Sequence, residues 1–578
     1  MANAQTPSVG RDDVFFSGQP DAPSWWSEPG RPGYVPDMAW GIGYPWTLMG
    51  HYRGAWTMDD PHLEETGPLP DLRVPTPIGW ADSLAVETGG DGAWSGFEAS
   101  LATARLVPAR LMKRDSTKVR AVADLNLTTG SSAYDGNALS AIKGDSANWV
   151  RAAATSWTRG GYGTLGTAGR HQFDIADRWS RGRHHLEAAL TSMGWADGLE
   201  GSIQESSAGA GGVLGYGVDL NGASLNASFG RGYDHRESFG DFITNEGDFF
   251  HVPNSRRDAH QRRMTFEAES PNRDWGARLE VRNEQVNRAT EEPPDSLGNH
   301  VAETDDDATS VWAAGRVSRQ HGPARIEASL GAGRHGGVSG TQLAPSFSFR
   351  FAQGGWVSRT YVERVMAPVW TDLALQQTPF LQSTWLGGFD LGHQGTATRA
   401  RIGWIMGETQ NRALVDPFPL QDLWLRFGYR RDPSAYDFGM ATASGDWIGK
   451  RWAAHGELYQ LFRDSQTASE TFDPRRGGRF GLETRFRAFQ GDLGVRLRGE
   501  MGLFGGRPNA VDPSIWVPGD ATFAASALLT LLDANVTVRF ENLENKRRSL
   551  PWQDPITQQE AVSEGFGFRL ALNWRLYN

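Results

Sequence analysis

Apolar and polar residues alternate along the chain from about residue 119 to its end. The last segment shows this most clearly. One of its faces is apolar, with Phe566, Phe568, Leu570, Leu572, Trp574 and Leu576, and the other carries Gly567, Arg569, Ala571, Asn573, Arg575 and Tyr577. A period of two residues is typical of a β-strand with one apolar face. The sequence therefore predicts an all-β region built from strands of roughly ten residues.

Short turns that contain Gly or Asn separate these segments, and they alternate with long polar loops such as Asp234–His260 and Asn287–Thr309. Gly and Asn tolerate the positive φ angles of hairpin turns. The short turns are Arg181-Gly182, Asn221-Gly222, Asn272-Arg273, His321-Gly322, Gln353-Gly354, His393-Gln394-Gly395, Gln490-Gly491 and Asp533-Ala534. This order predicts an antiparallel up-and-down sheet with an even number of strands, about 18–22. Near residues 421–462 the predicted strands no longer alternate between upward and downward directions, so the exact number of strands stays open.

Strand length and aromatic placement favour a transmembrane β-barrel over a soluble sheet. Strands of about ten residues suit a tilted crossing of the hydrocarbon layer, whereas soluble strands average roughly 5–6 residues. Trp and Tyr lie near many strand ends, as in the interfacial girdles of membrane barrels. These residues are Trp179, Trp275, Trp312, Trp356, Trp385, Trp404, Trp424, Trp452, Trp574 and Tyr577. The main alternative is a soluble β-propeller, whose repeat of about 40–45 residues overlaps the turn spacing but needs four short strands per blade.

Residues 1–118 differ from the rest, because they are rich in Pro, Gly and Trp and show little periodicity. Pro blocks long helices and central strands. We therefore expect an irregular N-terminal segment in the lumen or at the periplasmic mouth of the barrel. The predicted domains are this segment, 1–118, and the barrel, 119–578.

The composition excludes several classes of protein. The 578 residues include 23 Trp, 28 Phe and 12 Tyr, which is incompatible with global disorder. Cys is absent, so disulfides, zinc ribbons and thiol nucleophiles are excluded. The formal net charge of −11 argues against a nucleic-acid partner. No apolar run reaches the length of about 18 residues that a transmembrane helix needs.

Two segments near the C-terminus resemble a known family. Residues Asn535–Leu543, followed by Asn545-Lys546-Arg547, resemble the penultimate strand of TonB-dependent outer-membrane receptors, and residues Gly567–Leu576 look like their last strand. The resemblance implies a 22-stranded barrel in a bacterial outer membrane. It also implies contact with outer-membrane lipid and lipopolysaccharide, and with the barrel-assembly machinery during biogenesis. The glycine-rich pattern of the family's plug domain is not found in residues 1–118, so the resemblance is to a receptor barrel without a normal plug.

Arginines on the polar faces of the predicted strands are the main candidate site. Arg on the lipid face would cost about 2–4 kcal/mol at the membrane midplane, so we expect these side chains to line the lumen. The predicted basic track consists of Arg278, Arg282, Arg426, Arg485, Arg487, Arg496, Arg498, Arg539, Arg569 and Arg575. It could attract anionic solutes or seat a plug-like segment. Because Glu267, Glu280, Glu483 and Glu500 lie beside it, it could equally be a set of cross-strand ion pairs that stabilise the wall.

Other candidate chemistry is weaker. Glu303, Asp305, Asp306 and Asp307 lie together in a predicted loop, and carboxylates at this density could bind Ca²⁺, although a solvated acidic loop explains them as well. The match to GxGxxG at Gly161–Gly166 is not followed by a helical pattern, so it does not predict a nucleotide site. The catalytic motifs HExxH and GxSxG and the Walker lysine motif are absent. We predict no catalytic residues, no cofactor and no enzymatic activity.

Two functions are compatible with such a barrel. The first is passage of solutes across the outer membrane, as a porin-like or receptor-derived channel. The alternative is a non-transporting anchor or scaffold that binds a periplasmic or surface protein through its long loops or its N-terminal segment.

Overall fold

The computed structural model describes most of the barrel region and parts of the N-terminal region. The described residues are 9–10, 47–48, 51–52, 55–58, 81–88, 92–98, 102–108, 120–131, 133–145, 147–160, 165–199, 204–243, 249–291, 301–369, 380–416, 428–463, 475–509, 514–553, 560–562 and 565–577.

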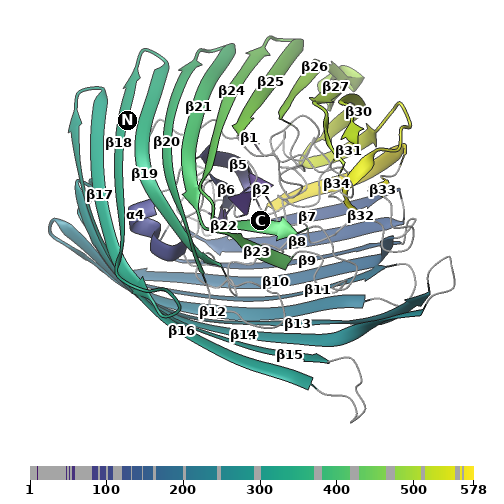
Figure 1. Cartoon of the computed structure of the whole chain (residues 1–578). Helices are drawn as coiled ribbons and strands as arrows, with labels where there is room; N and C mark the ends of the chain where they lie inside the picture. Colours follow the sequence, from purple (N-terminus) through teal and green to yellow (C-terminus); the bar gives the residue numbers. More distant parts are fainter. Residues whose placement is uncertain are drawn as a thin grey trace.

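Twenty-two antiparallel strands close into one barrel (Figure 1). The strands are β7 (Arg120–Gly130), β8 (Tyr134–Gly144), β9 (Trp149–Arg159), β10 (Leu165–Arg181), β11 (His184–Leu199), β12 (Gln204–Leu220), β13 (Ala223–Ile243), β14 (Phe249–Glu269), β15 (Trp275–Glu291), β16 (Val301–His321), β17 (Ala324–His335), β18 (Gln342–Gln353), β19 (Trp356–Val369), β20 (Phe380–Gln394), β21 (Thr398–Gln410), β24 (Tyr436–Ile448), β25 (Trp452–Arg463), β26 (Arg476–Ala488), β27 (Leu493–Phe504), β30 (Asp520–Leu531), β31 (Ala534–Glu541) and β34 (Gly567–Tyr577). The barrel closes where β34 pairs with β7. This confirms the predicted fold, with the strand number that the receptor resemblance implied.

Every short turn named from the sequence joins two neighbouring barrel strands. Gly182, Gly222, Gly322 and Gly354 have φ angles of 64°, 96°, 56° and 60°, which L side chains rarely adopt. A short 3-10 turn, η5 (Phe489–Gly491), makes the corresponding connection between β26 and β27. These turns mark the periplasmic end of the barrel, because outer-membrane barrels have short periplasmic turns.

Within residues 119–578, three described hairpins lie outside the barrel ladder: β22 (Arg412–Asp416) with β23 (Gly428–Asp432), β28 (Arg507–Pro508) with β29 (Trp516–Val517), and β32 (Ser549–Gln553) with β33 (Glu560–Val562). The first explains why the parity failed near residues 421–462. Strand β21 pairs directly with β24, so the hairpin between them contributes no crossing strand. It contacts β3 of the N-terminal region and lies inside the ring of strands in Figure 1.

Several strands are longer than predicted. Strands β13, β14 and β16 have 21 residues each, so most of the expected loops Asp234–His260 and Asn287–Thr309 is strand. The apolar alternation is confined to the part of each strand that crosses the bilayer. Beyond it polar residues occur on both faces, as at Asp234, His235, Arg236 and Glu237 of β13, and the period-two signal that marks a strand in the sequence disappears.

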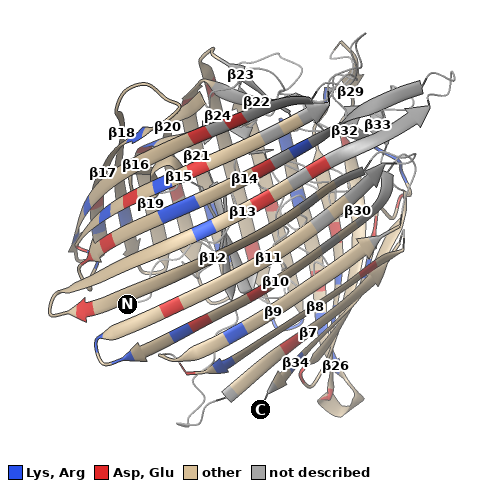
Figure 2. Cartoon of the chain, turned by 90° about the horizontal axis from the view of Figure 1, so that it is seen from below, with Lys and Arg blue, Asp and Glu red and all other residues tan. Residues whose placement is uncertain are grey.

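The outer face of the wall is apolar and exposed. Phe173, Leu190, Phe266, Val317 and Leu482 are 49, 59, 51, 62 and 56 % exposed, and no second protein layer covers them in the described residues. Figure 2 shows that charged positions are interspersed among uncharged ones along the barrel strands. This excludes a soluble sandwich or propeller, in which the same side chains would be packed against another sheet. A closed barrel with a lipid-facing apolar wall is an outer-membrane protein.

The N-terminal region contains regular structure that the sequence analysis did not predict. Strands β1 (Val9–Gly10), β5 (Ala81–Thr88), β6 (Ala102–Pro108) and β4 (Ala55–Met58) form a four-stranded sheet in this order, and β2 (Thr47–Leu48) pairs with β3 (His51–Tyr52). A short helix, α4 (Gly92–Ser95), continues into a 3-10 turn, η3 (Gly96–Glu98). None of the helices in the described part of the chain is long and apolar enough to span a bilayer.

Candidate functional site

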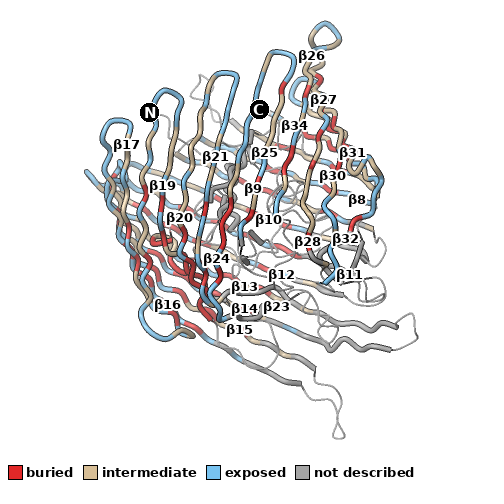
Figure 3. Tube along the Cα trace, turned by 45° about the horizontal axis from the view of Figure 1, so that its top comes forward, coloured by how far each residue is buried: buried red, intermediate tan, exposed pale blue. Residues whose placement is uncertain are grey.

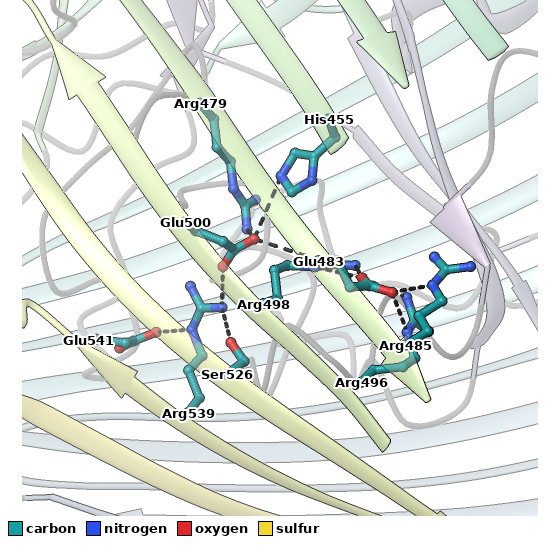
Figure 4. Close-up of polar contacts among 10 residues, drawn as sticks. All are labelled: His455, Arg479, Glu483, Arg485, Arg496, Arg498, Glu500, Ser526, Arg539 and Glu541. Atoms are coloured by element: carbon teal, nitrogen blue, oxygen red, sulfur yellow. Dashed lines mark hydrogen bonds and ion pairs between the residues drawn. The ribbon is translucent and has the colours of Figure 1, made fainter. Parts of the chain in front are cut away.

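A network of arginines and glutamates covers the inner face of β26, β27, β30, β31 and β34 (Figure 4). At its first centre, Glu483 accepts hydrogen bonds from Arg496 Nε at 2.8 Å and from Arg498 Nη2 at 2.6 Å, and it is also paired with Arg485. The Glu483 side chain is 2 % exposed. Three guanidinium groups therefore share one buried carboxylate.

A second centre lies around Glu500. Its carboxylate accepts hydrogen bonds from Arg479 Nη2 at 2.5 Å and Arg539 Nη1 at 2.6 Å, and His455 Nε2 lies 3.7 Å away. Strand β30, between β27 and β31, presents only the small Ser526 at this level, and Arg539 reaches across it while donating to the Ser526 hydroxyl at 3.3 Å.

Glu541 completes the network. It accepts a hydrogen bond from Arg539 Nε at 2.8 Å and lies 3.5 Å from Arg569 Nη2. The network holds six arginines (Arg479, Arg485, Arg496, Arg498, Arg539 and Arg569) and three glutamates. It is positively charged overall. Arg479 was missed from the sequence, although its position two residues from Gly481 and four from Glu483 places it on the same face of β26.

The remaining predicted arginines are distributed around the barrel. Arg278 on β15 pairs with Glu280 at 2.7 Å and Glu267 at 3.1 Å, and Arg282 lies 3.4 Å from Glu284. Arg575 donates two hydrogen bonds to Asp124 across the β34–β7 closure, at 2.8 and 3.0 Å. Arg487 is exposed near the periplasmic end of β26, and Arg426 lies outside the described residues. The nine predicted arginines that the structure describes therefore lie in separate groups on the inner wall.

The segment Gly92–Glu98 is docked on the inner wall of β16–β20, on the side of the lumen opposite the arginine network. The N–H of Gly92 donates to Glu363 Oε2 at 3.0 Å, and Trp312 Nε1 donates to the carbonyl of Ala93 at 2.9 Å. Both contacts are buried. Figure 1 shows α4 inside the ring of strands, beside β17 and β19.

An apolar cluster supports this docking. Phe97 is 2 % exposed and its ring lies 5.0 Å from that of Trp312 in an edge-to-face arrangement. Met366 and Leu381 complete the cluster together with Ala314 and Ala344, and Trp94 packs against it. The Arg316 guanidinium lies 4.3 Å from the centre of the Trp94 ring. Figure 3 shows the concentration of buried positions in this part of the wall. The sequence placed Trp312 in an interfacial aromatic girdle, but Trp312 is 2 % exposed and lies on the inner wall. The other residues of the cluster were not singled out from the sequence.

The acidic residues proposed as a Ca²⁺ site lie on β16 and not in a loop. Asp305 and Asp307 are exposed on its outer face, where Asp307 Oδ1 accepts a hydrogen bond from Asn283 at 2.8 Å and Asp305 Oδ1 one from Gln285 at 3.5 Å. Asp306 has the opposite parity on the strand, which separates it from them. Among the residues that the structure describes, no group of three or more potential metal ligands is found.

The fold matches those of solved outer-membrane receptors. The copper transporter OprC superposes with a TM-score of 0.76 at 11 % identity, covering 100 % of this chain and 99 % of that one. The ferric yersiniabactin uptake receptor FyuA from Yersinia pestis gives 0.76 and 11 %, covering 100 % and 98 %. BauA, the ferric preacinetobactin receptor from Acinetobacter baumannii, gives 0.73 and 12 %, covering 98 % and 96 %.

The sequence matches no protein-family model and no curated protein. The solved structures named above are transporters and receptors and not enzymes, in line with the prediction of a protein without catalytic activity. At 9–12 % identity, the likeness concerns the fold. The chain thus has the 22-stranded barrel fold of the TonB-dependent outer-membrane receptors.

Proposed function

We propose that this protein is an outer-membrane transporter that passes a small anionic solute, and that residues 1–118 act as a short plug seated on the inner wall of β16–β20. The observation that carries the proposal is the buried docking of Gly92–Glu98, with Phe97 and the Glu363 and Trp312 hydrogen bonds at its centre. A segment held in the lumen by both apolar and polar contacts obstructs passage until it is displaced.

The charge of the lumen supports the choice of an anionic solute. Arg485 is 33 % exposed and Arg487 is exposed, and both lie toward the periplasmic end of β26. The excess of arginine over glutamate on this wall leaves a positive potential, which raises the local concentration of anions. The names of two of the solved structures mention copper and ferric yersiniabactin; for this chain we propose only the sign of the solute's charge.

Single-channel recording in planar lipid bilayers tests the proposal. We expect the full chain to be nearly silent and a variant lacking residues 1–118 to form open channels, with a reversal potential in a KCl gradient that reports preference for Cl⁻. Replacing Arg487 by Gln in the truncated protein should weaken this preference, while Arg181→Gln, which changes an exposed arginine on the outer wall, should not. A folded truncated barrel that stays silent would instead favour the anchor or scaffold function.

A further inference from the structure

Three arginines lie side by side on the inner wall near the periplasmic end of the barrel. Arg325 on β17 is the direct cross-strand partner of Arg350 on β18, and Arg350 is in turn the partner of Arg359 on β19. We call these three residues the arginine row. It lies close to the periplasm, because Arg350 is four residues before the turn at Gly354 and Arg359 is four residues after Gly355.

The arginine row faces the lumen. Arg359 has the same parity on β19 as Tyr361 and Glu363. Tyr361 is 2 % exposed, and Glu363 binds the docked segment Gly92–Glu98. Val362, which has the opposite parity, is 52 % exposed on the lipid-facing side. The three guanidinium groups are therefore on the solute side of the wall and not on its lipid side.

Neighbouring side chains orient the two outer members of the row. Arg325 Nη2 donates a hydrogen bond to the Ser318 hydroxyl at 3.0 Å and lies 3.3 Å from Glu327 Oε2. The Arg359 guanidinium lies 4.4 Å from the centre of the Tyr361 ring. Arg350, between them, is exposed. The row thus holds its outer cations in place and keeps its central cation accessible.

Arginines outnumber carboxylates on this part of the wall. From the periplasmic turns up to the level of Tyr361, the described inner face of β17–β21 carries five arginines and two carboxylates: Arg325, Arg350, Arg359, Arg399 and Arg401, with Glu327 and Asp390. Asp390 accepts hydrogen bonds from Arg401 at 2.8 and 3.2 Å, and Asp446 on β24 opposes Arg399. The excess of positive charge therefore lies over the arginine row. Like charges directly opposite one another destabilise a sheet, and a bound anion offsets this cost.

The row lies on the periplasmic side of the docked segment, on the same wall. Glu363, which accepts the Gly92 hydrogen bond, is four residues from Arg359 along β19. Gly331, beside the Ala93 carbonyl, is six residues from Arg325 along β17. Figure 1 shows α4 beside these strands. Once the segment is displaced, a solute that moves along this wall toward the periplasm passes over the row.

The spacing of the row indicates the kind of anion that fits it. Neighbouring strands lie about 4.8 Å apart, so the three arginine positions span about 10 Å. Guanidinium groups bind carboxylate and phosphate oxygens through paired, charge-assisted hydrogen bonds. A single carboxylate or phosphate bridges two neighbouring guanidinium groups, whereas an anion with two or more charged groups reaches all three.

We propose that the arginine row binds a small multivalent anion, with two or more phosphate or carboxylate groups, at the periplasmic exit of the lumen. Its role rests on the proposed transport function, because the row would be the last site that the anionic solute contacts before the periplasm. Binding itself needs only the folded barrel, so it is measurable in the full chain without any conductance.

The binding test uses the full chain in mild detergent, with pyrophosphate as the multivalent probe and inorganic phosphate as the smaller one. Isothermal titration calorimetry at equal ionic strength should show that pyrophosphate binds at least tenfold more tightly than phosphate. Arg350→Gln should weaken pyrophosphate binding at least fivefold. Arg319→Gln is the matched control, because Arg319 is exposed on the outer face of β16, opposite Ile326, and it should keep the wild-type affinity.

A cysteine reporter locates the bound anion without changing the row. The chain contains no Cys, so Gln320→Cys introduces a single thiol, at an exposed position that is the cross-strand partner of Arg325. A negatively charged thiosulfonate reagent should modify this thiol faster than a positively charged one, because the row attracts anions. Pyrophosphate should slow the modification at least fivefold, and adding Arg350→Gln should remove this protection.

Equal affinity of wild type and Arg350→Gln for pyrophosphate would overturn the proposal. A Gln320→Cys thiol that pyrophosphate does not protect would do the same, as would phosphate that binds as tightly as pyrophosphate. The transport function is tested separately. If pyrophosphate binds the row while the barrel lacking residues 1–118 conducts no current, the anion site is supported and the transport function is contradicted.

Discussion

Individual arginines show what can be inferred from a strand pattern and what cannot. The period of two placed Arg498 and Arg539 on inward faces, and the structure has them there. It did not reveal that Arg539 reaches Glu500 two strands away, because that contact depends on the register of β27, β30 and β31 and on the small Ser526 between them. The face on which a side chain lies follows from the sequence, whereas its ion-pair partner depends on the register of the closed sheet.

Removing the shared carboxylate at Glu500 should destabilise the barrel strongly. In Glu500→Gln, Arg479 and Arg539 lose a charge that is 3 % exposed, and breaking a buried ion pair costs about 3–5 kcal/mol. Glu327→Gln is the matched control, since Glu327 and its partner Arg325 are 26 and 32 % exposed and such pairs contribute less than about 1 kcal/mol. Equilibrium unfolding in urea with lipid vesicles measures the free energy of unfolding of both variants. An equal loss of free energy in the two variants would contradict the strong stabilisation assigned to the buried ion pairs of Glu500.

The turn between β8 and β9 should make stability depend on pH. Asp145 Oδ1 accepts hydrogen bonds from the N–H groups of Asn148 and Ala147, both at 2.7 Å, and these lower the pKa of Asp145. A lowered pKa in the folded state stabilises the protein above the unfolded-state pKa, and this contribution is lost as the pH falls through the folded-state pKa.

We therefore expect Asp145→Ala to unfold at lower urea concentration than wild type at pH 7 and at the same concentration once Asp145 is protonated in both states. Asp492→Ala provides a control in another periplasmic turn, because the Asp492 side chain makes no hydrogen bond to a described residue. A difference for Asp145→Ala that persists unchanged at low pH would show that the loss has another cause.

Among the elements, the long strands and the N-terminal segment departed most from expectation. Strands β13 and β14 continue past the bilayer, where polar residues occur on both faces, and the sequence pattern there predicts loops instead of strands. The docked segment Gly92–Glu98 was not found because its partners lie on β16–β20, more than 200 residues away in sequence. Local patterns carry no information about such contacts.

A single methyl group on β17 should weaken the docking of this segment. A Cβ at Gly331 would overlap the carbonyl oxygen of Ala93 and the Trp312 ring. Gly331→Ala should therefore raise the open probability of the full chain in bilayers. Gly315→Ala on the neighbouring strand is the control, because its Cβ would meet nothing nearer than 4.0 Å. If the full-length Gly331→Ala variant conducts no current while the variant lacking residues 1–118 does, other contacts hold residues 1–118 in place.

At the scale of the whole molecule, the sequence predicted the architecture better than the site. Periodicity and turns established an up-and-down barrel, and the last 45 or so residues indicated the strand number, because the β31–β34 pattern resembles a family whose barrels have one size. The four-stranded N-terminal sheet was not predicted, since its strands are short and separated by Pro-rich stretches without alternation.

Closure of the barrel should depend on β34. This strand pairs with β31 on one side and β7 on the other, and its loss would expose two edges whose backbone groups have no partner in lipid. Deleting residues 565–578 should abolish the shift in electrophoretic mobility between unheated and boiled samples after refolding into detergent. Arg575→Gln, which removes only the ion pair with Asp124, should keep that shift. If the truncated chain still shows the mobility difference between unheated and boiled samples, β31 can pair directly with β7.

The unequal strand lengths give the barrel a high side and a low side. At about 3.3 Å per residue and a tilt near 45°, the 21 residues of β13 or β14 rise to roughly 50 Å, about twice the apolar band of such barrels. The 8 residues of β31 reach less than half as high. On the cell exterior, continuous barrel strands therefore surround one half of the entrance, whereas above the arginine-rich wall the separate hairpins β28–β29 and β32–β33 take their place.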